Sequence, residues 1–212
     1  MKLTVVGCSG SFPPSAGSAC SSYLVEADGF RLLLDMGNGA LGELQRHVGL
    51  YDLDAIFLSH LHADHCIDMC AYFVVRYYPH GGERPARIPV YGPDGTEQRL
   101  TTAHADTPPS DHAMSEVFDF HTLKPGWFEI GPPFSVRTEK LCHPVDTFGI
   151  RIEHGGSSLT YSGDTAPARP WTSWPRARTS SSARRPSCTA RRTSRTSTST
   201  AARPASWPPG RR

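Results

Sequence analysis

Four side chains that commonly bind metal ions lie within six residues, HLHADH at positions 60–65, directly after a short apolar run. Alternate residues of an extended segment point to one side, so a strand ending here can present His60 and His62 together. The following turn can direct Asp64 and His65 toward a second ion. The other interpretation, a solvated polar loop, requires chance clustering of four ligand types. This stretch therefore predicts a metal site, with Zn²⁺ suited to these ligands and Mn²⁺ or Fe also compatible.

The HLHADH stretch resembles the H-x-H-x-D-H signature of metallo-β-lactamase-fold hydrolases. Four further segments resemble the RNase Z-like branch of that family, in the family's order: LTVVGCSG near the start, LLLDMG with its Asp-x-Gly end, CHP, and YSGDT. The resemblance covers about residues 1–165. It implies one α/β domain with a four-layer αββα sandwich.

The resemblance also implies a ligand set for two divalent ions. His60, His62 and His143 hold the first ion in this interpretation. Asp64 and His65 hold the second, and Asp164 bridges both. The family's last ligand, a histidine downstream of the bridging aspartate, has no counterpart in this sequence, so the expected fold and metal shell are incomplete at the C-terminal end.

Two neighbouring divalent ions lower the pKa of a bound water, so a metal-bridging hydroxide is the expected nucleophile. Asp64 is the expected catalytic residue, since it would bind the second ion and orient the nucleophile. The sequence contains no G-x-S-x-G turn and no Ser-His-Asp order. These features predict a metal-dependent hydrolase.

The number of residues between two of the expected ligands, His143 and Asp164, bears on the class of substrate. RNase Z-like enzymes that process tRNA usually carry a long flexible arm between these positions, but only twenty residues separate His143 from Asp164. The short spacing resembles a compact bacterial branch that includes atypical class II-like cyclic-nucleotide phosphodiesterases. A small phosphodiester, with 3′,5′-cyclic AMP as the leading substrate, is therefore expected. An RNase Z-like ribonuclease acting on RNA is the alternative, and thioesterases and lactam hydrolases share the metal motif.

Composition changes abruptly after Thr165. The number of Lys and Arg residues minus the number of Asp and Glu residues is 11 − 20 = −9 up to that residue and 11 − 0 = +11 after it. Residues 166–212 contain no Leu, Ile, Val or Phe. Such a segment cannot bury enough apolar surface to offset its ordering entropy, so a disordered Arg/Ser/Pro-rich tail is expected.

A one-nucleotide frameshift between Asp164 and Trp171 accounts for this tail. Back-translated with G/C-rich codons and shifted by one nucleotide, residues 171–175 can read LDELA. Residues 179–200 can then read VLLCEASFLHGKEDIPDLHLNG, which contains a buried-strand pattern. Two other interpretations stay open: an Arg-rich arm that binds RNA in a metal-dependent nuclease, and an inactive truncated fragment.

No apolar run approaches the roughly 18 residues of a membrane span, and the start resembles no secretory signal. A cytoplasmic protein without a membrane partner is therefore expected, and dimers are common among relatives of the fold.

Hydrophobic patterning predicts a β-rich chain with flanking helices. The predicted helices are residues 40–48, 67–78 and 95–105. The predicted strands are residues 5–7, 22–26, 31–35, 55–59, 88–91, 118–123, 128–130, 135–141, 148–153 and 159–162.

Overall fold

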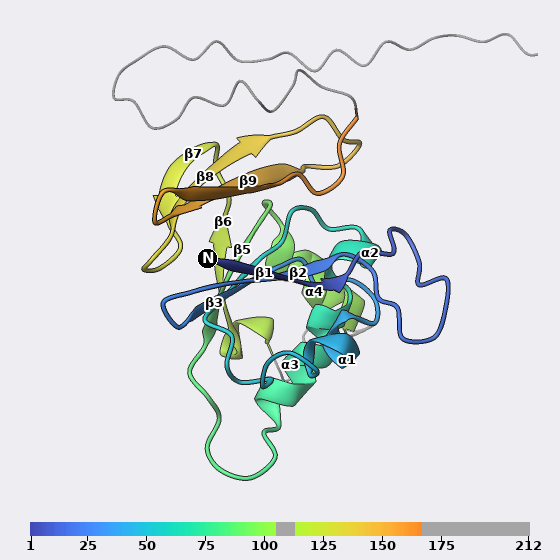
Figure 1. Cartoon of the computed structure of the whole chain (residues 1–212). Helices are drawn as coiled ribbons and strands as arrows, with labels where there is room; N and C mark the ends of the chain where they lie inside the picture. Colours follow the sequence, from blue (N-terminus) through green and yellow to red (C-terminus); the bar gives the residue numbers. More distant parts are fainter. Residues whose placement is uncertain (105–112, 167–212) are drawn as a thin grey trace, which may run out of the picture. The chain divides into compact units, whose positions relative to one another are not determined.

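The computed structural model describes residues 1–104 and 113–166 (Figure 1). Most of the predicted tail, residues 167–212, lies outside this part of the chain. The described residues form helices, a first sheet and a second sheet in successive layers. Three layers of the predicted α/β sandwich are therefore present.

The first sheet is half antiparallel and half parallel. Its order is β1 (Lys2–Gly7), β2 (Ser22–Ala27), β3 (Phe30–Leu34), β4 (Ala55–Phe57), β5 (Ile88–Gly92) and β6 (Phe118–Thr122). Strands β1 to β3 pair antiparallel and strands β3 to β6 pair parallel. Parallel neighbours need crossover connections, and helices occupy them. These are α1 (Ala40–Leu44), α2 (Ala63–Cys66), α3 (Asp68–Tyr77) and α4 (Thr96–His104).

The second sheet is an antiparallel meander in the order β10-β9-β8-β7. Its strands are β7 (Gly126–Glu129), β8 (Ser135–Lys140), β9 (Phe148–His154) and β10 (Ser157–Tyr161). A single-turn 3₁₀ helix, η1 (Met114–Glu116), precedes β6.

Two apolar cores lie on opposite faces of the first sheet. Leu33 and Ile56 face the helices, where they join Tyr72 and Phe73 of α3. Leu32 and Leu34 face the second sheet. Because both faces of the parallel strands are covered, β3 and β4 consist of nearly continuous apolar residues.

Each predicted helix and strand overlaps an observed one, but the structure differs in three places, because the first helix is shorter and neither α2 nor η1 was predicted. The first predicted helix ends at Leu44, because the following turn tightens into hydrogen bonds from Arg46 and His47 to residues three positions back. A short helix, α2, occupies the position of the predicted turn and carries Asp64 and His65. None of the helices in the described ranges has the length and apolarity to cross a membrane.

Gly37 allows the loop after β3 to pack on the backbone of α2. A Cβ atom at this position would lie 1.9 Å from the carbonyl oxygen of Asp64. The neighbouring Met36 N–H donates to the carbonyl of His65 at 2.8 Å. The loop therefore fixes the backbone of α2, which carries Asp64 and His65.

We expect Gly37→Ala to lower the melting temperature by at least about 5 °C, because the added methyl group collides with main-chain atoms. Gly42→Ala is the matched control, since no atom lies within 4 Å of the Cβ position at Gly42 in α1. Alanine is the better helix former, so the control should be neutral or slightly more stable. Thermal unfolding by circular dichroism measures both, and equal melting temperatures would contradict the packing assignment.

Candidate metal centre

Three imidazoles converge at the C-terminal end of β4. His60 Nε2 lies 3.1 Å from His62 Nδ1, and His143 Nε2 lies 3.2 Å from the same atom. His60 and His62 follow β4, whereas His143 lies in the loop between β8 and β9. One ring nitrogen from each residue lies within 4.8 Å of the others, so the three can hold one ion.

A second ligand group shares His60 with the first. It consists of His60, His65 and Asp164, again with ligand atoms within 4.8 Å of one another. Both Asp64 Oδ2 and Asp164 Oδ1 lie 3.5 Å from His65 Nε2. All six residues singled out in the sequence therefore lie in one region, and the second group joins Asp164 to one histidine from each predicted set.

An orphaned nitrogen supports the fit of a cation in the second group. His65 Nε2 is buried and has no hydrogen-bond partner among residues 1–104 and 113–166. Buried polar atoms in folded proteins are usually satisfied by a partner. A divalent ion between this nitrogen and the two carboxylates would satisfy it, and the N/O donor set matches zinc and manganese chemistry.

Asp35 contacts residues that carry or adjoin the candidate ligands. The sequence analysis assigned Asp35 no role in the site. Its fully buried carboxylate accepts hydrogen bonds from Ser59 N at 2.6 Å, Ser59 Oγ at 2.7 Å and His65 Nδ1 at 2.6 Å. The Tyr161 hydroxyl of β10 donates to the same carboxylate. Asp35 itself adopts a left-handed φ of 58°. An acidic residue at the end of an apolar strand was the available sequence signal.

These contacts decide which nitrogens are free to bind metal. Ser59 has one hydroxyl hydrogen and donates it to Asp35, so its oxygen accepts a hydrogen bond from His60 Nδ1 at 3.0 Å. His65 likewise donates its Nδ1 hydrogen to Asp35. The lone pairs of both residues therefore lie on Nε2, and such contacts behind metal ligands commonly fix the tautomer.

The pKa values of the two buried imidazoles shift in opposite directions. Burial, followed by the charge of His65, lowers the pKa of His60 to about 4, so its lone pair is available near neutral pH. Burial also disfavours protonation of His65, but the hydrogen bond and charge of Asp35 outweigh it and raise the pKa of His65.

Gly163 brings the second sheet to the site. A Cβ atom there would lie 2.6 Å from Ser59 Oγ, and the residue has a φ of +56°. The close approach of the two loops places Asp164 beside His65. Asp164 is thus positioned by a backbone conformation at residue 163 that favours glycine.

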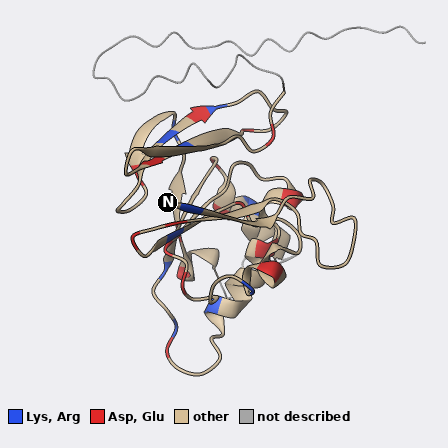
Figure 2. Cartoon of the chain, viewed as in Figure 1, with Lys and Arg blue, Asp and Glu red and all other residues tan. Residues whose placement is uncertain are grey.

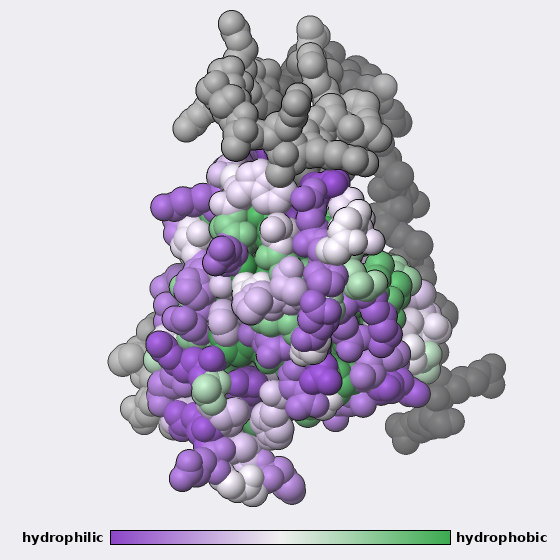
Figure 3. Space-filling model, turned by 60° about the vertical axis from the view of Figure 1, so that its left-hand side comes forward, coloured by the Kyte–Doolittle hydropathy of each residue, from purple (hydrophilic) through white to green (hydrophobic). Residues whose placement is uncertain are grey.

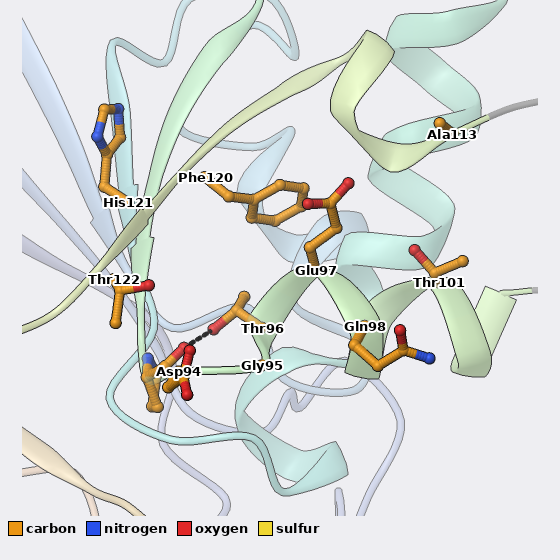
Figure 4. A pocket seen from close by; sticks show the side chains of 11 residues that line it. Asp94, Gly95, Thr96, Glu97, Gln98, Thr101, Ala113, Phe120, His121 and Thr122 are labelled. Carbon is orange, nitrogen blue, oxygen red and sulfur yellow. Dashed lines mark hydrogen bonds between the residues drawn. The ribbon is translucent and has the colours of Figure 1, made fainter.

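A cavity of about 370 Å³ opens beside the second ligand group, and both His65 and Asp164 line it. A larger hollow of about 550 Å³ lies at the ends of β5 and β6 (Figure 4). Figure 4 shows Glu97 and Phe120 directed toward each other across it. None of the six predicted ligands lines the larger hollow, whereas two of them line the smaller cavity. Acidic residues are spread over the helices, strands and loops of the described chain (Figure 2).

Comparisons with known proteins indicate one family. The family model described as "Metallo-beta-lactamase superfamily" matches residues 16–203. "Uncharacterized protein Rv1339" of Mycobacterium tuberculosis is 37% identical over 171 residues, which is 78% of this chain and 60% of that protein. "Ribonuclease Z" of Mycobacterium bovis BCG is 30% identical over 184 residues, covering 79% and 64%.

A solved structure gives the same result for the fold. The crystal structure of the metallo-beta-lactamase fold protein YhfI from Bacillus subtilis superimposes with a TM-score of 0.65 at 27% identity, covering 79% of this chain and 63% of that one. By sequence, "Probable metallo-hydrolase YhfI" is 30% identical over 167 residues, covering 78% and 64%. The chain spans less than two thirds of the length of each of these relatives.

We expect Asp35→Asn to weaken metal binding by about 10- to 100-fold, because the amide directs a donor at groups that already donate and frees the His65 tautomer. Asp119→Asn is the matched control, since Asp119 pairs with His121 at 3.1 Å on the surface. Competition with a chromophoric chelator measures affinity. Unchanged affinity in folded Asp35→Asn protein would refute the role of this carboxylate.

A second expectation concerns acid stability without metal. The unfolded chain protonates His60 near pH 6.5 and the folded chain near pH 4. The unfolded state therefore binds more protons in this window, and the contribution of His60 makes stability fall as pH drops from 6.5 to 4. His60→Gln should unfold with a weaker pH dependence than the wild type in urea titrations across this window, whereas the exposed His80→Gln should follow the wild type. Parallel curves for His60→Gln and wild type would count against this assignment.

Proposed function

The chain belongs to the metallo-β-lactamase superfamily of metal-dependent hydrolases, and from this premise we propose that it hydrolyses a small phosphodiester with two divalent ions. Zinc is the proposed metal, and 3′,5′-cyclic AMP is the proposed substrate. Two adjacent ligand groups support a dinuclear rather than a mononuclear site. His60 has one free nitrogen and is assigned to the first ion, while Asp64 lies beside His65 in the second group. The chain is shorter than its relatives, so the activity proposed is that of the whole protein.

Each candidate residue has a distinct task in this proposal. His60, His62 and His143 hold the first ion, and His65 and Asp164 hold the second. When bound, the ions supply an activated nucleophile and neutralise charge on the phosphoryl group. Asp64, whose carboxylate lies 3.5 Å from His65 Nε2, binds the second ion and orients the attacking group.

The single observation that carries the substrate class is the short connection between His143 and Asp164. Strands β9 and β10 fill it, and a two-glycine turn, Gly155 and Gly156, joins them. The hairpin leaves no residues for a long flexible arm. A compact substrate that reaches the cavity beside His65 therefore fits better than a folded RNA.

Processing of RNA is the second candidate function. The observation in its favour is the 30% identity to the ribonuclease Z of Mycobacterium bovis BCG. An RNA substrate would need a binding surface outside the short hairpin. The two candidates differ in substrate size, which a direct competition can test.

We expect the version of the chain with the one-nucleotide shift reversed to hydrolyse 3′,5′-cyclic AMP in the presence of Zn²⁺ or Mn²⁺. His62→Ala and Asp64→Asn should each lower kcat/KM by about 100-fold or more, because each removes a metal ligand. The exposed His80→Ala should retain full activity. The 212-residue chain should bind the second ion weakly and turn over little.

The same protein should be offered a precursor tRNA with a 3′ extension. Faster cleavage of the RNA than of cyclic AMP would favour the ribonuclease. Activity unchanged by His62→Ala would rule out this centre as the site of either reaction.

A further inference from the structure

One side of the sandwich is open between the edges of β1 and β10. Leu3 and Val5 pair with Val25 and Tyr23 of β2 and therefore share the face that meets the second sheet. Yet Leu3 is 46% exposed and Val5 is 52% exposed. The space-filling view also shows hydrophobic groups at the surface of the described chain (Figure 3). Within the described part of the chain, the inter-sheet face thus lacks apolar cover along β1.

The opposite wall of this opening is β10. Within the described ranges β10 pairs with β9 alone, so its other edge presents unpaired backbone groups. The cavity of about 370 Å³ lies between the two edges, with Leu3 and Tyr23 on one wall and Leu159 and Tyr161 on the other. A free strand edge beside an uncovered apolar face is a site for strand addition.

The path of the chain through the first sheet indicates where a strand after β10 would lie. Strands β1, β2 and β3 form an antiparallel meander whose end leads to Asp35, and β8, β9 and β10 form another whose end leads to Asp164. Both aspartates approach His65, from Nδ1 and from Nε2 respectively. After the first meander the chain forms α1 and returns as β4, parallel to β3 on its free edge. The second meander ends at a matching edge.

The residues after Ala166 differ in composition from such a strand. They contain no Leu, Ile, Val or Phe and no acidic residue. An uncovered apolar face needs apolar side chains at alternate positions. The segment that fits this edge must therefore have a different composition.

A shift of reading frame changes the composition in the required direction, although the result depends on which class of serine codon is used. An AGY codon, which the reading LDELA requires at Ser173, gives Glu, Gln or Lys. A TCN serine codon contributes TC as the last two bases of the shifted codon, and every NTC codon encodes Phe, Leu, Ile or Val. With such codons, Ser180–Ser182 must become three consecutive apolar residues. Threonine codons likewise become Tyr, His, Asn or Asp, which restores polar and acidic side chains between apolar ones.

We infer that the coding sequence shifts by one nucleotide between Asp164 and Trp171, and that the peptide of the restored frame covers this opening. The segment read as LDELA forms a crossover helix. The apolar run beginning VLL then adds to the free edge of β10 as a parallel strand and covers Leu3 and Val5. The connection is right-handed, as such crossovers almost always are.

The first test is genetic and needs neither metal nor substrate. Sequencing the gene from its source across codons 164–171, with the intact mass of the native protein, should give the restored frame. A continuous reading frame together with a native mass that contains the printed tail would overturn the inference.

The second test compares the printed and restored chains by hydrogen exchange. Amides of residues 157–161 that do not bond to β9 should exchange on the order of 100-fold more slowly in the restored chain. Equal exchange in both chains would overturn the docking of a strand on β10. Protection in both chains that depends on protein concentration would show a second copy at this edge and would also overturn it.

A matched pair of substitutions locates the covered face. Val5→Asp should lower the melting temperature of the restored chain by about 10 °C, because it buries an unpaired charge, and should change that of the printed chain little. Val74→Asp is the control, since Val74 is 44% exposed on α3, on the far side of the first sheet. Equal effects of Val5→Asp in both chains would overturn the assignment of Leu3 and Val5 to the covered face. None of these readouts involves hydrolysis, so failure of the proposed function would leave them unaffected.

Discussion

The buried carboxylate of Asp35 is the contact on which the candidate centre depends. It receives hydrogen bonds from Ser59, which follows β4 and precedes the first histidine, from His65 on α2, and from Tyr161 on the second sheet. A carboxylate without such partners would be costly to bury. Four donors offset that cost and at the same time fix the positions of the groups that donate. The left-handed backbone at Asp35 is the local strain that this arrangement tolerates.

The centre therefore forms only when both sheets are in place. His60, His62 and His65 come from one continuous segment, but His143 and Asp164 come from the ends of strands in the second sheet. Their side chains meet because Gly163 allows the second sheet's loop to approach Ser59. The candidate ligands therefore come together when the two sheets pack against each other. Changes between the sheets should affect metal binding without touching a ligand.

Local patterns in the sequence were sufficient for most of the fold. Apolar runs and alternation predicted each strand of both sheets. HLHADH identified four of the six candidate ligands by spacing alone. His143 and Asp164 needed the family resemblance, because nothing nearby distinguishes them from turn residues. Asp35 was missed as part of the site because its role depends on contacts with residues 24 and 126 positions away. Helix α2 was missed because four residues are too few for a periodic pattern.

Cover of the open side and chemistry at the centre are physically linked. The cavity between β1 and β10 is also the cavity that His65 and Asp164 line. Interactions of ions and carboxylates strengthen as water is excluded. The side chain of Asp164 is 52% exposed to solvent, whereas that of Asp35 is fully buried. A strand against β10 would reduce the access of water to Asp164 and so strengthen its attraction for a cation. The same segment that stabilises the sandwich would then decide whether the second ion binds tightly enough for catalysis.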